Sequence, residues 1–588
     1  MERAWFEMRA EIRRPYAGSV WIPLRAFIED EEKEFGQLGY RAEVTAVRSV
    51  AVHLAQRDKA EQLSWTNTHY DHGVYTYDGH YKPAEVHQQQ TGVDLGIELV
   101  LDQHFGGLEP RIWYLNQDMV FALRLLREGD VWVCPGEGYI EVARLTRDVE
   151  GHETSLLIRS EFLKDYLTAR SMALRLFCYR SRQAILGDCS QIGWTREGSS
   201  AEIFGGHFEG RAWDIHEGGE PFGSGAAVVH VFRTDFDFEA DVPTLEPNEE
   251  NVSSNTRNVR RSGRKLCRVE GQYWRNEWVE PATVSVRLRG DKIPSAASFI
   301  IGAAGERVSA DDLGYENVGR WLWFSPHIVM TILSRRGSSL EWFTRDTAGL
   351  QLAGGNRVYF GLNENDLVTA YASDVARLPE WQRIIWAGFN VAPNGGVSRE
   401  QLAAQVDARP ASTQAPERLL ERGLITPNTT FQARWGMSLL REHEETRNIL
   451  ARAHRFRALD QAGLLSLAKD LARLTADSFD LDALREFVST AKGEKLGSLK
   501  LLEQVLGTLI GSSDAHQLMG PLVGVYDLRL GDAHLPSGKI ADAIALAGVD
   551  ADASGLQQGT QLLSATVSAI YAITQAFALP TKSSGTNS

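Results

Sequence analysis

Residues 496–510 read LGSLKLLEQVLGTLI, and this stretch indicates the fold class of the C-terminal part of the chain. Its apolar residues recur at the spacing of one helix face: Leu496, Leu499, Leu502, Leu506, Leu509 and Ile510. A similar stripe precedes it at residues 464–474, and a last helix is predicted at about 556–579, ending before Pro580. This series of amphipathic helices predicts an all-α bundle over residues 431–580.

The composition changes toward the N-terminus. All 15 tryptophans lie between Trp5 and Trp435, in segments that mix strand and helix patterns. Residues 42–55 alternate as a half-buried strand would, whereas residues 112–127 (IWYLNQDMVFALRLLR) predict a helix. We therefore expect an α+β chain, with a large, aromatic-rich, mixed α/β N-terminal portion of one or two lobes before the bundle.

A block of charge interrupts the aromatic portion. Seven acids lie in residues 235–250, and six bases follow in residues 257–268. This block predicts a linker or an exposed loop, because like charges gathered in short runs favour solvent. The alternative is a phosphate-contacting arm that binds nucleic acid through Arg260, Arg261, Arg264 and Lys265.

These patterns divide the chain into five predicted parts. The first is expected to act as a sensor or regulatory domain. The parts are a mixed α+β domain at 1–235, an acidic-then-basic linker or loop at 236–268, a second β-rich aromatic lobe at 269–430, the helical bundle at 431–580 and a disordered tail at 581–588.

Composition excludes several classes of protein. The net charge is −15, of which residues 1–430 carry −13, so a general nucleic-acid coat protein is disfavoured. No apolar run approaches the roughly 20 residues of a membrane helix, and the charged first residues lack a secretory signal. The four cysteines (134, 178, 189 and 267) form no C-x2-C pair, which predicts free thiols, no structural zinc and a cytoplasmic location.

The best candidate site lies in residues 522–537, LVGVYDLRLGDAHLPS. Arg529 and His534 have four residues between them, Asp532 lies two residues before the histidine, and Gly531 and Pro536 predict a bend. Histidine can take or give a proton near neutral pH, and the arginine fork suits phosphate oxygens. Together they could cleave RNA without a metal or cofactor, using the 2′-OH as the nucleophile.

An Arg-x4-His motif near the last helix of a helical bundle resembles the HEPN family, which occurs in RNA-cutting toxins and antiviral defence proteins. The resemblance covers at most the last ~150 residues and rests on one short motif. The family usually has a polar residue directly after the arginine, where this chain has Leu530. The resemblance implies an endoribonuclease effector that acts on RNA as a homodimer, with Arg529, His534 and Asp532 as catalytic residues, held in check by the N-terminal portion until an unknown trigger binds.

Three alternatives stay open. A second pair, Arg447 and His454, lies in a charged helical stretch, and Asp-Ala-His recurs at residues 514–516. A histidine cluster in a Tyr- and Asp-rich stretch could bind a divalent ion for a metal-dependent hydrolase, although its spacing matches no motif: His69, His72, His80 and His87. The chain could instead be a non-catalytic scaffold whose bundle dimerises and whose aromatic portion binds a ligand or partner.

Overall fold

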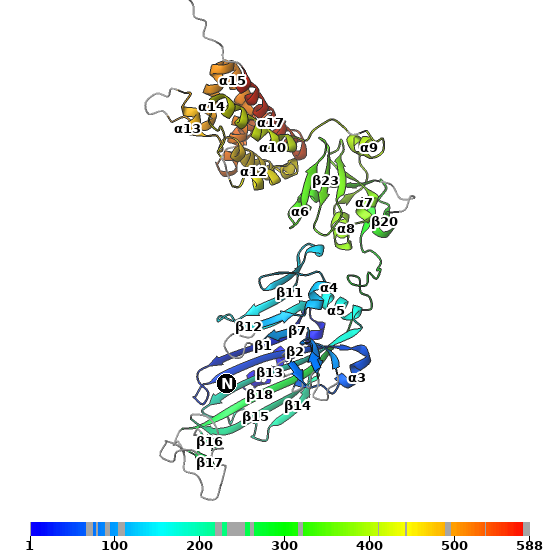
Figure 1. Cartoon of the computed structure of the whole chain (residues 1–588), viewed down its shortest axis with the longest axis vertical. Coiled ribbons are helices and arrows are strands. Elements are labelled where there is room, and N and C mark those ends of the chain that lie inside the picture. The colour runs from blue at the N-terminus through cyan, green and yellow to red at the C-terminus, as the bar shows by residue number, and fades with distance from the viewer. Residues whose placement is uncertain are drawn as a thin grey trace, which may run out of the picture. The chain divides into compact units, whose positions relative to one another are not determined.

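The computed structural model describes residues 2–65, 75–77, 80–88, 94–103, 112–217, 226–231, 253–258, 264–314, 321–409, 411–441, 444–488, 495–534 and 537–579. The chain divides into two compact units. Unit 1 comprises residues 1–135 and 139–293, and unit 2 comprises residues 136–138 and 294–588. The α+β prediction is confirmed, because unit 1 is rich in strands and the C-terminal part of unit 2 is helical (Figure 1).

Unit 1 is built on one large antiparallel sheet. β6 (Asp94–Ile97) adds to β2 at one end and pairs with β5 (Val86–Gln88). The main path runs in the order β14 (Ser199–Ile203), β15 (Gly206–His216), β18 (Lys265–Val279), β13 (Met172–Leu186), β2 (Arg41–His53), β1 (Trp21–Glu32), β12 (Glu153–Arg159), β11 (Ile140–Arg147), β10 (Val131–Cys134) and β9 (Leu126–Glu128).

Shorter elements complete unit 1. The helix α5 packs its buried Phe162, Leu163, Tyr166 and Leu167 into the largest core of this unit. The elements are α1 (Arg3–Glu7), α2 (Arg9–Ile12), α3 (Arg57–Ala60), α4 (Gln117–Ala122), α5 (Ser160–Ala169), and the hairpins β3–β4 (Tyr75–Tyr77, His80–Lys82), β7–β8 (Val100–Gln103, Ile112–Leu115) and β16–β17 (Ala226–Val231, Ser253–Asn258).

The segment 236–268, which was predicted to be a linker or an exposed loop, does not separate the two units, because unit 1 continues to residue 293. The last residues of that segment, from Lys265, begin β18, which pairs with both β13 and β15 in the middle of the sheet. Along β18 the odd-numbered residues from Cys267 to Val279 are buried and the even-numbered ones are more exposed. Of the six bases, Lys265 and Arg268 lie on β18, and the chain divides after residue 293 instead. Residues 232–252 and 259–263 lie outside the described residues.

The helix predicted over 112–127 is also wrong. That stretch forms β8 (Ile112–Leu115), the six-residue α4 (Gln117–Ala122) and β9 (Leu126–Glu128). Asn116 divides the stretch, because its side chain accepts a hydrogen bond from the Asp118 backbone and caps α4. The apolar residues at helical spacing are in fact divided among three elements: Tyr114 and Leu115 on β8, Val120 on α4 and Leu126 on β9.

Unit 2 begins with a six-stranded antiparallel sheet. Its order is β22 (Ser339–Trp342), β23 (Thr347–Gln351), β24 (Val358–Leu362), β25 (Val368–Tyr371), β21 (Trp321–Phe324) and β26 (Asn390–Val391). The other elements are the hairpin β19–β20 (Ser298–Ile300, Arg307–Ser309), α6 (His327–Leu333), α7 (Ala372–Ala376), α8 (Glu380–Ala387) and α9 (Arg399–Gln405).

The helical bundle follows, and it begins earlier than residue 431. α10 (Pro416–Trp435) packs along α17 (Gly555–Ala578) although it contains Pro427, which would normally interrupt a helix. The remaining helices are α11 (Thr446–Arg452), η6 (Arg455–Leu459), α12 (Gln461–Leu474), α13 (Leu481–Arg485), α14 (Ser498–Ile510), α15 (Ser512–His534) and α16 (Ser537–Leu546). The tail predicted at 581–588 lies outside the described residues.

The bundle and the six-stranded sheet of unit 2 share a core. Phe456 of η6 stacks on Trp342 of β22, with ring centroids 5.9 Å apart and planes 15° apart. Arg455 is 2% exposed and forms two 2.8 Å hydrogen bonds with Glu417 of α10. The Arg455 guanidinium also lies 4.2 Å from the Trp342 ring centroid. An ion pair is thus enclosed where α10, η6 and β22 meet.

Candidate functional site

Arg529 lies on the surface of the bundle, on helix α15. Leu522, Val525 and Leu528 of this helix are fully buried, so Arg529 stands at the edge of the packed face, where its side chain is 31% exposed. Its guanidinium donates to the carboxylate of Asp477, which follows α12, and lies 5.3 Å from the Tyr526 ring centroid. The arginine is therefore held in place and is still reached by solvent.

Gly531 does not bend the chain, because α15 continues through it to His534. Pro536, which marked the predicted bend together with Gly531, lies outside the described residues, between the end of α15 and the start of α16. Successive residues of a helix turn by about 100°, so position 532 lies about 60° from position 529, and position 534 about 140° from it. On the surface of this helix, position 532 is therefore next to position 529, whereas position 534 lies on another face. The side chains of Asp532 and His534 lie outside the described residues, so their contacts with Arg529 stay a prediction.

One carboxyl in this helix was not singled out from the sequence. Asp527 lies seven residues before His534, which places the two positions on nearly the same helix face. Burial raises the pKa of the Asp527 carboxyl. A search for acids at i−7 from the histidine would have found it.

The alternative pair, Arg447 and His454, is separated by the fold. Arg447 is exposed on α11, whereas His454 is 5% exposed and lies beyond the end of that helix. Burial lowers the pKa of His454 to about 4, and its Nδ1 atom is buried without a hydrogen-bond partner. His454 is a neutral core histidine. His516, of the earlier Asp-Ala-His triplet, is 80% exposed and bonds to Glu503.

The predicted basic arm is only partly described. Arg260 and Arg261 lie outside the described residues. The Lys265 ammonium lies 2.7 Å from the Asp214 carboxylate on β15, and the Arg264 carbonyl accepts from the Glu217 backbone. Lys265 is therefore part of the sheet, at the start of the interior strand β18, and phosphate binding by these four bases stays a prediction.

The described residues of the histidine cluster do not form a metal site. His69 and His72 lie outside the described residues, and of His80 and His87 only the strand backbone is described. Among the residues that the structure does describe, no group of three or more His, Cys, Asp or Glu side chains is placed to hold a metal ion.

The prediction of four free thiols is wrong. Cys189 and Cys267 form a disulfide with Cα atoms 6.0 Å apart. The sheet brings them together, since Cys267 on β18 pairs with Leu186 at the end of β13, three residues before Cys189. Cys134 and Cys178 are buried thiols, and burial raises the pKa of Cys178.

A cleft in unit 1 was also missed from the sequence. It has a volume of about 370 Å³ and lies over β1 and β2, beside the β7–β8 hairpin and the start of β12. The sheet register explains part of its lining, because Phe27 pairs with Ala46 and therefore shares a face with Arg48, two residues further along β2. The cleft is lined by Arg25, Ala26, Phe27, Ala46, Arg48, Trp65, Trp113, His152 and Glu153.

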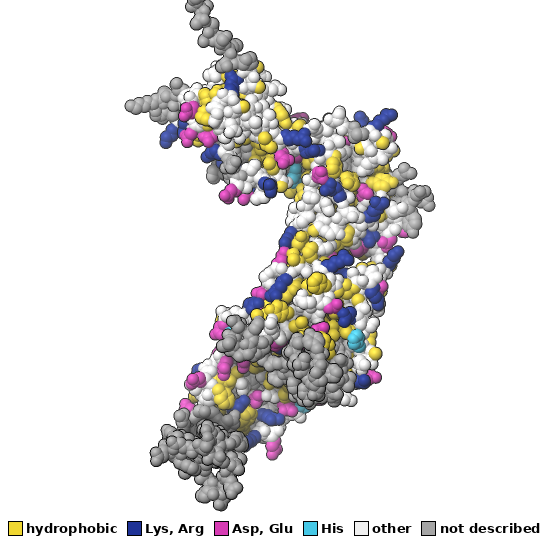
Figure 2. Space-filling model, viewed as in Figure 1, with side chains coloured by type: hydrophobic (Ala, Val, Ile, Leu, Met, Phe, Trp, Pro, Cys, Tyr) yellow, Lys and Arg dark blue, Asp and Glu magenta, His cyan; other side chains and the backbone are white. Residues whose placement is uncertain are grey.

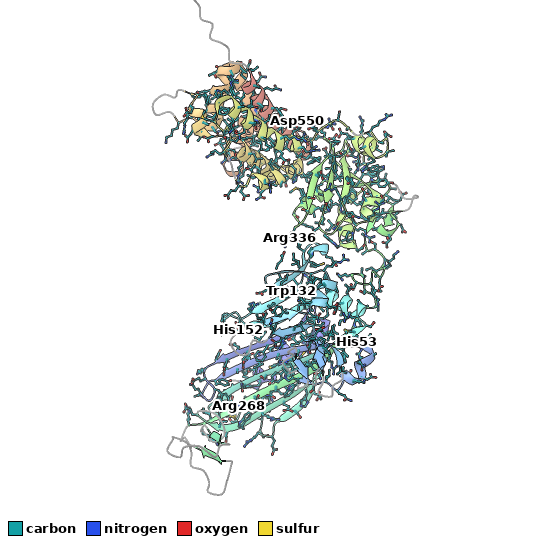
Figure 3. The ribbon with its side chains drawn as sticks, in the orientation of Figure 1. His53, Trp132, His152, Arg268, Arg336 and Asp550 are labelled. Carbon is teal, nitrogen blue, oxygen red and sulfur yellow. A yellow bond between two sulfur atoms is a disulfide. The ribbon has the colours of Figure 1, made fainter. Side chains whose placement is uncertain are left out.

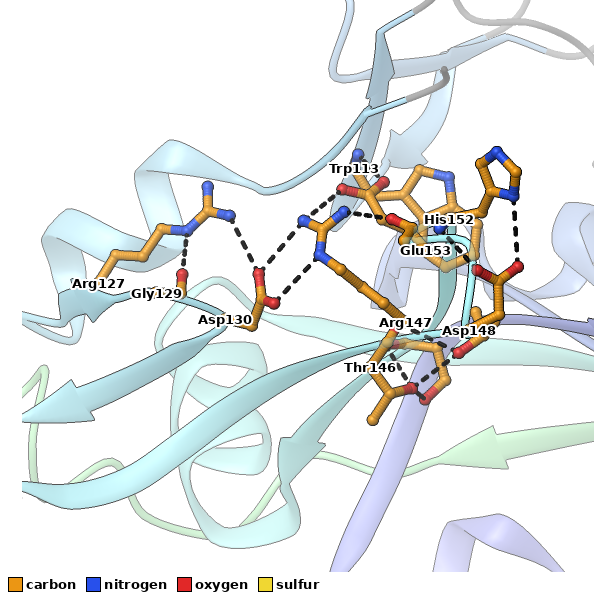
Figure 4. Close-up of polar contacts among 12 residues, drawn as sticks. Trp113, Arg127, Gly129, Asp130, Thr146, Arg147, Asp148, His152 and Glu153 are labelled. Atoms are coloured by element: carbon orange, nitrogen blue, oxygen red, sulfur yellow. Dashed lines mark hydrogen bonds and ion pairs between the residues drawn. The ribbon is translucent and has the colours of Figure 1, made fainter.

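A network of ion pairs supports one wall of this cleft (Figure 4). The Glu153 carboxylate accepts from the Trp113 backbone N–H and lies 3.2 Å from the Arg147 guanidinium, which also binds Asp130 at 3.1 Å. Burial raises the pKa of the Glu153 carboxyl. His152 points away from this network and lies 3.3 Å from Asp148, with its side chain 57% exposed (Figures 3 and 4).

Charged side chains of both signs are interspersed on the face shown in Figure 2. None of the described helices is long and apolar enough to cross a membrane. No family model, no curated protein and no solved structure matches this chain.

Proposed function

We propose that this chain is a metal-independent endoribonuclease with a HEPN-like C-terminal bundle, in which Arg529 binds the scissile phosphate and His534 transfers the proton. The observation that best supports this proposal is the position of Arg529. It is a partly exposed arginine on α15, five residues before a histidine that ends the same helix. Exposed guanidinium groups bind phosphate oxygens through two parallel hydrogen bonds.

The chemistry needs two steps that these residue types can perform. A neutral histidine takes the proton of the RNA 2′-OH, whose oxygen bonds to the adjacent phosphorus as the P–O5′ bond breaks, and the arginine stabilises the charge that develops on the phosphate. The protonated imidazole then gives its proton to the departing 5′-oxygen, so that the products are a 2′,3′-cyclic phosphate and a 5′-hydroxyl end. Because DNA lacks the 2′-OH, the same site spares DNA. The family resemblance adds a homodimer in which two Arg/His pairs face one cleft, and this arrangement is part of the proposal.

The carboxylate of Asp477 bears on how such a site is controlled. It accepts a hydrogen bond from the Arg529 guanidinium, so a phosphate has to displace this carboxylate before Arg529 can bind the phosphate. Both side chains are about one-third exposed, at 31% and 34%, and exchange of an exposed carboxylate for phosphate costs little, because surface ion pairs contribute only about 0–1 kcal/mol.

The wider role, a toxin or antiviral defence effector in the cytoplasm that unit 1 restrains until a trigger binds, rests on the resemblance. The Cys189–Cys267 disulfide argues against the cytoplasmic location, because disulfides are rare in reducing compartments. A growth assay after induction of the wild-type gene and of Arg529→Ala tests the toxin role directly.

The activity is tested with purified full-length protein, labelled single-stranded RNA and the same DNA sequence, in EDTA. We expect cleavage of RNA only, and at least a hundredfold loss in Arg529→Ala and in His534→Ala. The matched controls are Arg485→Ala, whose 52% exposed side chain pairs with Asp482 on the same bundle, and His516→Ala. Equal rates for the site variants and the controls would remove the proposal.

The second candidate is a non-catalytic scaffold, and the Arg529–Asp477 ion pair favours it, since such pairs are common on helical surfaces. This function predicts a folded, oligomeric protein without nuclease activity. Analytical ultracentrifugation of wild type and Arg529→Ala, run beside the cleavage assay, separates the two candidates.

A further inference from the structure

We propose that the cleft of unit 1 binds a flat, uncharged aromatic molecule, which packs against the rings of Phe27 and Trp65. The cleft lies wholly within unit 1, over β1 and β2, and has a volume of about 370 Å³. Small-molecule sites usually have volumes of roughly 300–1,000 Å³. This inference does not depend on the ribonuclease proposal, because it concerns another part of the chain and is tested by binding alone.

Two aromatic side chains supply apolar surface in the cleft. Phe27 on β1 is 51% exposed, and its partner across the strands is Ala46 on β2. Because an alanine side chain ends at Cβ, it leaves room beside the Phe27 ring. Trp65, which packs beside a small core of unit 1, lines the same cleft and is only partly buried. A ligand that covers both rings removes their apolar surface from water, which favours binding.

The two arginines of the cleft are bound to other groups of the protein. The Arg25 guanidinium lies 2.7 Å from the Asp102 carboxylate, and these side chains are only 14% and 6% exposed. The Arg48 guanidinium lies 5.7 Å from the Trp65 ring centroid. An anionic ligand that took Arg25 from Asp102 would leave the Asp102 charge buried and unpaired, which is costly. These arginines therefore do not favour an anionic ligand.

The glutamate and the histidine of the cleft are bound in the same way (Figure 4). The Glu153 carboxylate accepts a hydrogen bond from the Trp113 backbone N–H and lies 3.2 Å from the Arg147 guanidinium. The His152 imidazole lies 3.3 Å from the Asp148 carboxylate. A charged ligand would have to displace one of these partners, whereas an uncharged ligand leaves every pair in place. The lining therefore favours an uncharged ligand.

The same pairing decides between two kinds of uncharged ligand, a sugar and an aromatic ring system. A sugar carries a hydroxyl group on almost every carbon, and each hydroxyl needs a hydrogen-bond partner once water is excluded. The charged groups that line the cleft are already bound to other groups of the protein. A flat aromatic molecule needs few polar partners and packs against the rings of Phe27 and Trp65 by its face or its edge. The cleft is therefore assigned to an aromatic ligand.

The test is isothermal titration calorimetry on the full chain with four probes. They are 2-naphthol, which is flat and uncharged, its saturated and puckered analogue 2-decalol, its charged ester 2-naphthyl phosphate, and glucose. We expect 2-naphthol to bind below millimolar concentration and 2-decalol to bind at least fivefold more weakly, because a puckered ring stacks poorly on an aromatic side chain. The phosphate ester and glucose should bind at least tenfold more weakly than 2-naphthol. The affinity for 2-naphthol should be equal at low and high salt, because no ionic contact forms.

Two cleft variants and two matched controls locate the binding. Phe27→Ser and Trp65→Leu should each weaken the binding of 2-naphthol at least fivefold. Phe121→Ser, at an 80% exposed phenylalanine of α4, and Trp213→Leu, at a partly buried tryptophan of β15, lie outside the lining and should leave binding unchanged. Circular dichroism melts confirm that each variant folds. If Trp65→Leu does not fold, Phe27→Ser decides, because its side chain is half exposed.

Three results would overturn the inference. They are no binding of 2-naphthol at millimolar concentration, equal binding of 2-decalol or of 2-naphthyl phosphate, and equal binding of 2-naphthol by Phe27→Ser. Tighter binding of glucose than of 2-naphthol would also overturn it and would assign the cleft to a sugar instead. Because all readouts are binding heats, a failed ribonuclease assay does not affect them.

Discussion

Substitution of Glu417 by alanine tests how the bundle is joined to the six-stranded sheet. The Glu417 carboxylate accepts hydrogen bonds from Nε and Nη2 of Arg455, each at 2.8 Å, and from the Arg455 backbone N–H at 3.1 Å. The two side chains are 7% and 2% exposed. Removal of one partner from a buried ion pair costs about 3–5 kcal/mol, because the other charge stays buried and unpaired.

That cost predicts a large thermal shift confined to unit 2. At roughly 2–4 °C per kcal/mol for a large domain, the Tm of unit 2 should fall by roughly 6–20 °C. Differential scanning calorimetry of the full chain measures this fall, with the transition of unit 1 as an internal reference. Glu421→Ala, an exposed glutamate one helical turn later on α10, is the control. A fall below 2 °C, or an equal fall in the control, would refute the reasoning.

Three further predictions follow from single contacts. Asp477→Ala should raise the affinity of the bundle for RNA severalfold by freeing Arg529, as measured by fluorescence anisotropy, and no change would argue against phosphate binding there. Reduction of the Cys189–Cys267 bond, which closes a separation of 78 residues, should cost unit 1 about 4 kcal/mol, read from urea melts with and without reductant. Burial lowers the pKa of His454 from 6.5 to about 4, so unit 2 should be most stable above pH 6.5 and should lose stability as the pH falls toward 4. In His454→Gln, the free energy of unfolding should change less with pH over this range.

Local sequence patterns predicted those helices and strands whose apolar residues recur with a regular period. The stripe at 496–510 corresponds to α14, and the last helix predicted at 556–579 matches α17 (Gly555–Ala578) within one residue at each end. The strand predicted at 42–55 is β2. In each case the apolar face of the element packs against the core, so the pattern within one short stretch is enough to predict the element.

Those local patterns did not predict which strands pair with each other over long distances in the sequence. The residues from Lys265 onward appeared as part of a charged linker, because their partners on β13 and β15 lie about 50–90 residues earlier in the chain. The disulfide depends on the same pairing. Gly531 was expected to mark a bend together with Pro536, but α15 continues through Gly531, because a glycine inside a helix costs only about 1 kcal/mol, which the packed face of α15 offsets.

The Arg529–His534 pair and the cleft of unit 1 differ in the same way, because the first is local in sequence and the second is not. Arg529 and His534 were found because they are close in sequence, whereas the cleft of unit 1 collects residues from positions 25 to 153. Only the sheet register places Phe27, Ala46 and Arg48 on one face. A site assembled from four strands leaves no short motif to recognise.

Whether Arg529 and His534 cleave RNA is measured directly by the rate at which labelled RNA is cut in EDTA. We expect wild type and Arg485→Ala to cut RNA at equal rates, Arg529→Ala and His534→Ala to be at least a hundredfold slower with the same melting curve, and DNA to stay intact. If wild type leaves RNA uncut, or if Arg529→Ala cuts it equally fast, these two residues do not form a ribonuclease site.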